Sequence, residues 1–217
     1  MKKMIKELFG RVDTNILNHQ CDPYVQSRIN HIIRSVKRLG RDKGKRFAET
    51  TYPTVWLIHA LVINNQPDTV IETGTCTGYT TNAIADALEY NGHGRVYTFE
   101  LNEVWMKIAQ ETARVFDLSP YIKFITGDIH KTFSKTLEKI DNIDFVYHDI
   151  DPKEDYLWEQ KLMENKIPSG GMVIAHDTYP NDLRYEKGII DFLDYMEEKY
   201  FHINLPYERG LLLAIKK

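Results

Sequence analysis

The feature of this sequence that most constrains its fold is a repeated alternation of short apolar runs with amphipathic helical segments. The runs are rich in β-branched and aromatic residues, and the segments between them place apolar residues at three- and four-residue spacing. The runs lie at residues 70–71, 95–99, 121–126, 143–148 and 172–175. Alternation of this kind predicts a parallel sheet with helices on both faces, which is a three-layer α/β/α sandwich.

The end of the chain departs from this alternation. Two strand-like runs, at residues 201–205 and 210–215, are separated only by the turn residues 206–209. They predict a C-terminal antiparallel hairpin, so the expected sheet has seven strands and is mostly parallel. We predict helices at residues 53–64, 79–90, 103–116, 129–139, 153–166 and 185–200.

The first 50 of the 217 residues do not follow the alternating pattern, and we expect them to form a helical cap or extension. The main domain is then residues 51–217. An apolar stripe over residues 23–39, preceded by the start signal Asp22-Pro23, predicts one helix in the extension.

The extension also carries a basic run. From Arg28 to Arg46 there are eight lysine or arginine residues and one acid. Such a run usually forms a solvated helix face. Contact with the phosphates of a nucleic acid is the alternative reading of this run.

Composition limits the partners and the compartment. A net charge of -3 argues against a nucleic acid or an anionic membrane as the partner of the whole chain. The two cysteines, Cys21 and Cys76, cannot build a disulfide framework. The first ten residues lack the apolar middle of a signal peptide, and no stretch has the apolar length of a membrane span. We therefore expect a cytoplasmic protein.

A glycine or an acid follows each of the five predicted parallel strands. These residues are Gly74, Glu100, Asp128, Asp149 and Asp177. The C-terminal ends of parallel strands share one edge of the sheet, where open α/β folds bind their ligands. The first strand leads into a turn, residues 74–80, whose two glycines let the backbone lie close to a ligand. The sequence therefore predicts a cofactor site at this edge.

These residues resemble the motifs of the class I S-adenosylmethionine-dependent methyltransferases, and within them the catechol O-methyltransferase-like, metal-dependent O-methyltransferases. The first motif reads Glu72-x-Gly74-x-x-x-Gly78-Tyr79-Thr80, without the middle glycine of the wider family, as in that subgroup. The resemblance covers residues 53–217. Further motif matches lie at residues 98–102, 127–128, 145–149, 156 and 170–178.

The resemblance implies a Rossmann-like methyltransferase domain with a role for each motif residue. The residues implied to hold S-adenosylmethionine are Glu72, Gly74, Gly78, Tyr79, Thr80, Glu100, Asp128 and Asp149. Glu100 would take the ribose hydroxyls, and Asp128 would lie beside the adenine. Mg²⁺ would be bound by Asp149, Asp177 and Thr178. The implied catalytic residues are Asp149, Lys153 and His176, and we expect Tyr179 to contact the acceptor.

Two positions depart from the subgroup's pattern, and both bear on the use of a metal. The third metal ligand of the subgroup is asparagine, whereas this chain has Thr178. The lysine base of the subgroup lies three residues after the first metal aspartate, where this chain has Pro152. A one-residue insertion would bring Lys153 to the position of that base.

Two His-Asp pairs, His148-Asp149 and His176-Asp177, leave a different site open. Histidine combined with carboxylates can bind iron or manganese. Successive residues of a strand point to opposite faces, however, so we do not expect both members of a pair to reach one ion. His176 is then a general base, a substrate contact or a buried histidine with its hydrogen bonds satisfied.

We predict an O-methyltransferase that uses S-adenosylmethionine, assisted by Mg²⁺, on a phenolic, sugar or natural-product hydroxyl. The alternatives are methylation of a tRNA hydroxyl through residues 28–46, a metal-dependent hydroxylase-like protein, a nicotinamide oxidoreductase and a non-catalytic binding module. The missing Gly-x-Gly-x-x-Gly argues against the oxidoreductase. We expect a small-molecule acceptor as partner, no membrane partner, and a homodimer contact as one use for the first helices.

Overall fold

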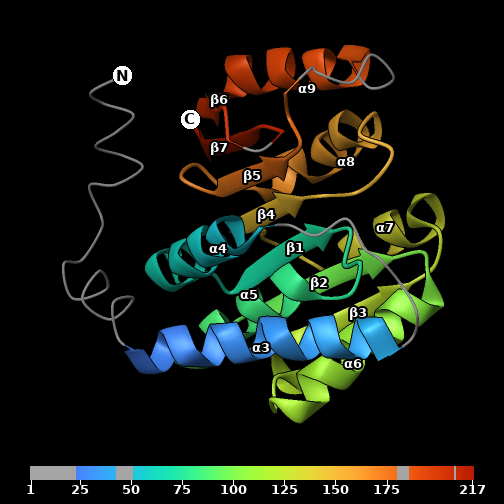
Figure 1. The fold of residues 1–217 in the computed structure, drawn as a ribbon. Coiled ribbons are helices and arrows are strands. Elements are labelled where there is room, and N and C mark those ends of the chain that lie inside the picture. The colour runs from blue at the N-terminus through green and yellow to red at the C-terminus, as the bar shows by residue number, and fades with distance from the viewer. Residues whose placement is uncertain (1–22, 43–50, 180–185, 208) are drawn as a thin grey trace.

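A computed structural model describes the chain outside residues 1–22, 43–50, 180–185 and 208. The described part forms one seven-stranded sheet covered by helices on both faces (Figure 1). Within these ranges, no helix combines the length and the apolar character that crossing a bilayer requires.

The strands follow the predicted pattern closely. They are β1 (Thr69–Thr73), β2 (Arg95–Glu100), β3 (Ile122–Thr126), β4 (Phe145–His148), β5 (Met172–His176), β6 (Tyr200–Leu205) and β7 (Leu211–Lys216). Their order in the sheet is β3-β2-β1-β4-β5-β7-β6. All neighbouring pairs are parallel except the two that involve β7. The three-layer α/β/α sandwich and the C-terminal hairpin are therefore confirmed.

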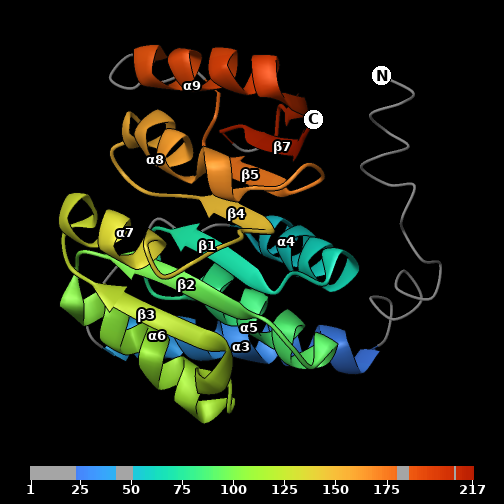
Figure 2. The same cartoon turned by 180° about the vertical axis from the view of Figure 1, so that it is seen from behind.

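The helices also lie where the apolar spacing predicts them. They are α3 (Pro23–Asp42), α4 (Tyr52–Asn65), α5 (Tyr79–Asn91), α6 (Glu103–Val115), α7 (Ile129–Leu137), α8 (Asp155–Met163) and α9 (Glu186–Lys199). Adjacent strand residues face opposite layers: Val70 packs in the core with α4 and α5, and Ile71 packs in the core with α7, α8 and α9. Figures 1 and 2 show these two layers from opposite sides.

Helix α3 packs on the main domain through its predicted apolar stripe. Ile29, Ile33 and Val36 are buried in a cluster with residues of α4, α5 and α6. This stripe is used within the chain, and it leaves other surfaces for the predicted homodimer contact. The predicted boundary at residue 50 lies in the segment 43–50, outside the described residues.

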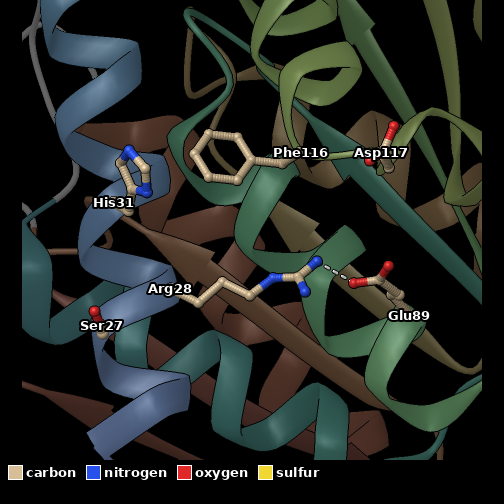
Figure 3. A pocket seen from close by; sticks show the side chains of 6 residues that line it. All are labelled: Ser27, Arg28, His31, Glu89, Phe116 and Asp117. Carbon is tan, nitrogen blue, oxygen red and sulfur yellow. Dashed lines mark hydrogen bonds and ion pairs between the residues drawn. The ribbon is translucent and has the colours of Figure 1, made fainter.

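Polar contacts fix α3 along the same face. Arg28 pairs with Asp86 and Glu89 of α5, and the His31 ring meets the Phe116 ring edge-on at 5.1 Å between centroids. Arg28, His31, Glu89 and Phe116 border a small cavity of about 350 Å³ (Figure 3). Arg28, the first residue of the basic run, is therefore a partner of α5. Residues 43–46 of that run lie outside the described part.

Candidate active site

A pocket of about 760 Å³ lies at the C-terminal edge of the sheet. Residues after all five parallel strands line it, as the sequence predicts: Gly74, Glu100, Asp128, Asp149 and Asp177. Lys153 and His176, two of the predicted catalytic residues, line it as well. Its size lies in the range of pockets that hold small molecules and cofactors.

Gly74 joins two of these strand ends. Its φ of +94° belongs to the left-handed region, and a Cβ there would lie 2.4 Å from the backbone oxygen of Asp149. The amides of Gly74 and Thr75 both donate to the Phe99 oxygen, at 3.1 and 3.0 Å. The turn after β1 is thus held between β2 and β4, and only glycine leaves room for β4.

Gly78, Tyr79 and Thr80 serve the packing of α5. Gly78 has a φ of +85°, and a Cβ there would lie 2.6 Å from the Cβ of Ala109 on α6. Tyr79 is buried in the cluster formed with α3, and Thr80 is 5% exposed. None of these three is among the described residues that line the pocket. Their predicted contact with the cofactor stays a prediction.

Glu72 lies beneath the turn. Its side chain is fully buried, and Oε2 accepts hydrogen bonds from the hydroxyls of Thr81 at 2.5 Å and Thr98 at 2.6 Å. Burial raises the pKa of this carboxyl to about 7. Glu72 therefore ties β1 to β2 and to the start of α5. It is not among the described residues that line the pocket, and the cofactor contact implied for it stays a prediction.

Glu100 presents its carboxylate to the pocket. Oε2 accepts from the Cys76 amide at 2.8 Å, and Oε1 accepts from the Asn102 amide at 2.7 Å. The N-cap of α6 is Asn102, so Glu100 is not needed there as a cap. Burial raises the pKa of Glu100, although the backbone hydrogen bonds oppose this change. A carboxylate oriented by two amides keeps further lone pairs for a ligand's hydroxyl groups.

Asp128 has a structural role in addition to its place at the pocket. It is the N-cap of α7, where its side chain accepts from the His130 amide at 3.0 Å and lies 3.3 Å from Lys131 Nζ. The hydrogen bond from the His130 amide lowers the pKa of Asp128. The helix cap and the adenine contact that the resemblance implies are therefore compatible with one position.

Asp149 and Asp177 converge because β4 and β5 are neighbours. One ligand atom from each, together with one from His176, lies within 4.8 Å of the others. His176 Nδ1 is 3.1 Å from Asp149 Oδ1 and 3.5 Å from Asp177 Oδ1. These three side chains are the only such cluster of potential metal ligands in the part of the chain that the structure describes.

The expectation that only one member of each His-Asp pair reaches this cluster holds for the first pair and is wrong for the second. His148 points into the α8 layer, where Nδ1 lies 2.7 Å from Glu159 and Nε2 lies 3.0 Å from Gln160. His176 and Asp177 both reach the cluster. The physical reason is the backbone of Asp177, whose φ of +56° breaks the alternation of the strand.

Lys153 lies among the carboxylates, as the proposed one-residue insertion predicts. Its Nζ is 3.5 Å from Asp149, 3.4 Å from Asp151 and 3.6 Å from Asp177. Burial lowers the pKa of this amine, but the three carboxylates outweigh that effect and leave the pKa above its usual value. Lys153 is therefore an ammonium at neutral pH.

Arg209 adds a second cation that the sequence reading did not identify. It precedes β7, and its guanidinium lies 2.7 Å from Asp177 Oδ2. Trp105 and His130 also line the pocket without having been predicted. Trp105 could have been proposed from its place in the first turn after β2, whereas Arg209 reaches the site from a distant hairpin.

Thr178 and Tyr179 are directed elsewhere. The Thr178 hydroxyl donates to Asn204 Oδ1 at 2.7 Å, and the side chain is fully buried. Tyr179 is 43% exposed, and its amide donates to the Arg209 oxygen at 2.7 Å. Neither is among the described residues that line the pocket. The acceptor contact predicted for Tyr179 stays a prediction.

This arrangement does not fit Mg²⁺. That ion prefers an octahedral shell of oxygens at about 2.0–2.1 Å, normally one or two carboxylates together with several waters. Here one of the three clustered donors is a ring nitrogen, and the predicted third ligand, Thr178, is hydrogen-bonded to Asn204. Both aspartates already face cationic side chains, Lys153 and Arg209.

Comparison with known proteins supplies a family. A model of the methyltransferase domain matches residues 71–178, which run from within β1 to just past β5. No curated protein sequence matches the chain.

Solved structures resemble the whole described fold. The O-methyltransferase from Bacillus cereus, solved with S-adenosylhomocysteine, is 19% identical and has a TM-score of 0.74, with 86% of this chain and 91% of that chain covered. TomG from Streptomyces achromogenes is an O-methyltransferase of tomaymycin synthesis solved with S-adenosylmethionine. It is 18% identical and has a TM-score of 0.72, with 86% of this chain and 89% of that chain covered. Methyltransferase PaMTH1 from Podospora anserina, bound to S-adenosylhomocysteine, is 12% identical and has a TM-score of 0.71, with 90% of this chain and 97% of that chain covered. At these identities the likeness establishes a common fold.

Proposed function

Because this chain belongs to the class I methyltransferases, we propose that it transfers the methyl group of S-adenosylmethionine to a hydroxyl of a small molecule. The observation that carries the proposal is Glu100, whose carboxylate is oriented by two amides at the wall of the pocket. The O-methyltransferases of similar fold, solved with this cofactor or its product, support the same assignment.

The pocket offers a place for each part of the cofactor. Glu100 would accept hydrogen bonds from the vicinal ribose hydroxyls, which suit the two oxygens of one carboxylate. Asp128 and Trp105 line the same pocket and would border the adenine. The turn at Gly74, beside Asp149, would receive the methionine end and direct the methyl group toward His176.

The chemistry is an in-line displacement. A lone pair of the acceptor oxygen forms a bond to the methyl carbon, the carbon–sulfur bond breaks, and its electrons stay on sulfur, giving S-adenosylhomocysteine. The acceptor also loses its hydroxyl proton, and His176 would take this proton, with Asp149 Oδ1 at 3.1 Å stabilising the imidazolium. The reaction needs little else from the protein than alignment of the two groups.

Lys153 has a different part in this proposal from the base that the resemblance implied. Because its pKa is raised, it holds its proton at neutral pH and is a poor base. Its ammonium would stabilise negative charge on the acceptor oxygen. Mg²⁺, the second cofactor expected from the sequence, has no step here because the donor set does not fit it.

Calorimetric titration with S-adenosylhomocysteine tests the proposal. We expect the wild type to bind, and Glu100→Ala to bind at least about 30-fold more weakly, since two hydrogen bonds to a charged group are lost. Glu103→Ala, an exposed acid on the first turn of α6, is the matched control and should bind like the wild type. Equal affinity of Glu100→Ala and the wild type would overturn the ribose assignment.

Methylation of a tRNA hydroxyl is the second candidate. The basic run of residues 28–46 motivates it, although Arg28 pairs with Asp86 and Glu89. Binding that weakens steeply as salt is added would favour tRNA. If tRNA does not bind at low salt, this candidate is removed.

A further inference from the structure

A buried ammonium lies between the two aspartates that the sequence assigned to a metal. We propose that Lys153 is a built-in substitute for the divalent cation, so that this chain methylates its acceptor without a metal. This inference rests on the proposed function for its chemistry. The part that concerns metal binding follows from the arrangement of the charges and does not depend on that function.

The geometry places one amine among three carboxylates. Nζ of Lys153 lies 3.4–3.6 Å from oxygens of Asp149, Asp151 and Asp177. The side chain is only 5% exposed, and Nζ lies 5.3 Å from the centre of the Tyr156 ring. Three carboxylates and an aromatic ring therefore fix the position of this buried ammonium.

The position of Lys153 is fixed from both ends of the cluster. Tyr156, three residues further on in the first turn of α8, is fully buried and donates its hydroxyl hydrogen toward the His148 oxygen at 3.2 Å and the His176 oxygen at 3.0 Å. These two oxygens belong to the residues just before Asp149 and Asp177. The start of α8, which directly follows Lys153 in the chain, is thereby attached to both strand ends that carry the lysine's partners.

The charges around the cluster disfavour a second cation. Asp177 is shared between Lys153 and Arg209, at 3.6 and 2.7 Å. A divalent ion bound to the same carboxylates would lie within a few ångströms of the ammonium and would be repelled in this buried setting. Bound metal would therefore require Lys153 to leave its partners.

The residue after Asp177 is committed to the C-terminal hairpin. The Thr178 hydroxyl donates to Asn204, the Asn204 amide group donates to the Thr178 oxygen at 3.2 Å, and the Thr178 amide donates to the Gly210 oxygen at 3.3 Å. Three hydrogen bonds thus hold Thr178 against β6 and the start of β7. They direct it away from the carboxylates.

An ammonium in place of a metal changes what the acceptor must offer. A divalent ion orients an acceptor best when two neighbouring oxygens bind it together, whereas an ammonium can hold a single oxygen by one hydrogen bond. We therefore expect a lone hydroxyl to suffice, without a second oxygen beside it.

Manganese binding to the full chain, followed by the electron paramagnetic resonance signal of free Mn²⁺, tests the inference. The wild type should bind Mn²⁺ weakly. Lys153→Met should bind it at least about tenfold more tightly, because the repelling charge is gone while Asp149 and Asp177 remain. Lys161→Met, at an exposed lysine of α8, the helix that follows Lys153, is the matched control and should behave like the wild type. Adding Asp177→Asn to Lys153→Met should abolish the gain.

Two results would overturn the inference: tight Mn²⁺ binding by the wild type that Asp177→Asn removes, or equal binding by Lys153→Met and Lys161→Met. The Mn²⁺ affinity of the wild type can refute the inference without any lysine variant, so poor folding of Lys153→Met leaves the test intact. Lys153→Gln provides a second variant. The affinity of the wild type for S-adenosylhomocysteine should be the same with and without EDTA. If no variant binds S-adenosylhomocysteine, the proposed function fails, whereas the Mn²⁺ series still decides the role of Lys153.

Discussion

Substitution of Gly74 by alanine should damage the joint between the cofactor turn and β4. The left-handed backbone, with φ +94°, costs an alanine about 1–2 kcal/mol. The new Cβ would also lie 2.4 Å from the Asp149 oxygen, a backbone atom that cannot rotate away. Overpacking of this kind adds about 1–3 kcal/mol, so we expect Gly74→Ala to lose about 2–5 kcal/mol of unfolding free energy.

Gly170→Ala separates the two contributions. Gly170 has nearly the same φ, +88°, but a Cβ there meets no heavy atom within 4 Å. It should lose only the backbone part, about 1–2 kcal/mol. The gain from a less flexible unfolded chain is the same for both variants and cancels in the comparison.

Urea unfolding of both variants and the wild type, combined with calorimetric titration of S-adenosylhomocysteine, measures these effects. We expect Gly74→Ala to be the less stable variant and to bind the ligand more weakly, because Asp149 is displaced. Gly170→Ala should keep the wild-type affinity. Equal losses of stability in the two variants would refute the argument that the contact with β4 requires glycine.

Two further substitutions test the buried polar groups around the site. Glu72→Gln should gain stability relative to the wild type as the pH rises from about 4.5 to about 7, by up to about 3 kcal/mol. The folded carboxyl, with its pKa of about 7, keeps a proton that the unfolded carboxyl loses near 4.5, so the wild type loses stability through this range. Urea unfolding at pH 5 and pH 8 checks this, and a pH-independent difference would contradict it. Tyr156→Phe should lose about 1–3 kcal/mol in the same assay because two buried carbonyl oxygens lose their donor, whereas the exposed Tyr179→Phe should lose less than about 0.5 kcal/mol.

The sequence predicted the architecture well because periodicity and strand ends are local signals. Val70 and Ile71 reveal a buried strand by their side chains alone, and Glu100 or Asp149 is identified as a site residue by its place after such a strand. The antiparallel hairpin was equally visible from two apolar runs with only a turn between them.

The arrangement inside the site depends on features that no local pattern encodes. Alternation along β5 predicted that His176 and Asp177 diverge, and the left-handed backbone of Asp177 reverses that outcome. Arg209 meets Asp177 only because β7 enters the sheet beside β5. Likewise, the resemblance suggested Lys153 as a base, whereas its three carboxylate partners, two from its own loop and one from the loop after β5, favour a permanent cation.

The antiparallel direction of β7 brings a second, separate segment of the chain to the ligand edge. Five parallel strands contribute their ends to the ligand edge, and β7, which runs the opposite way, contributes its beginning, preceded by Arg209. This part of the ligand edge lies far in the sequence from the turn that would receive the cofactor, and backbone hydrogen bonds from Thr178 and Tyr179 to Gly210 and Arg209 hold it in place. Arg209 can accordingly be replaced to change the charge at the ligand edge without altering the turn at Gly74.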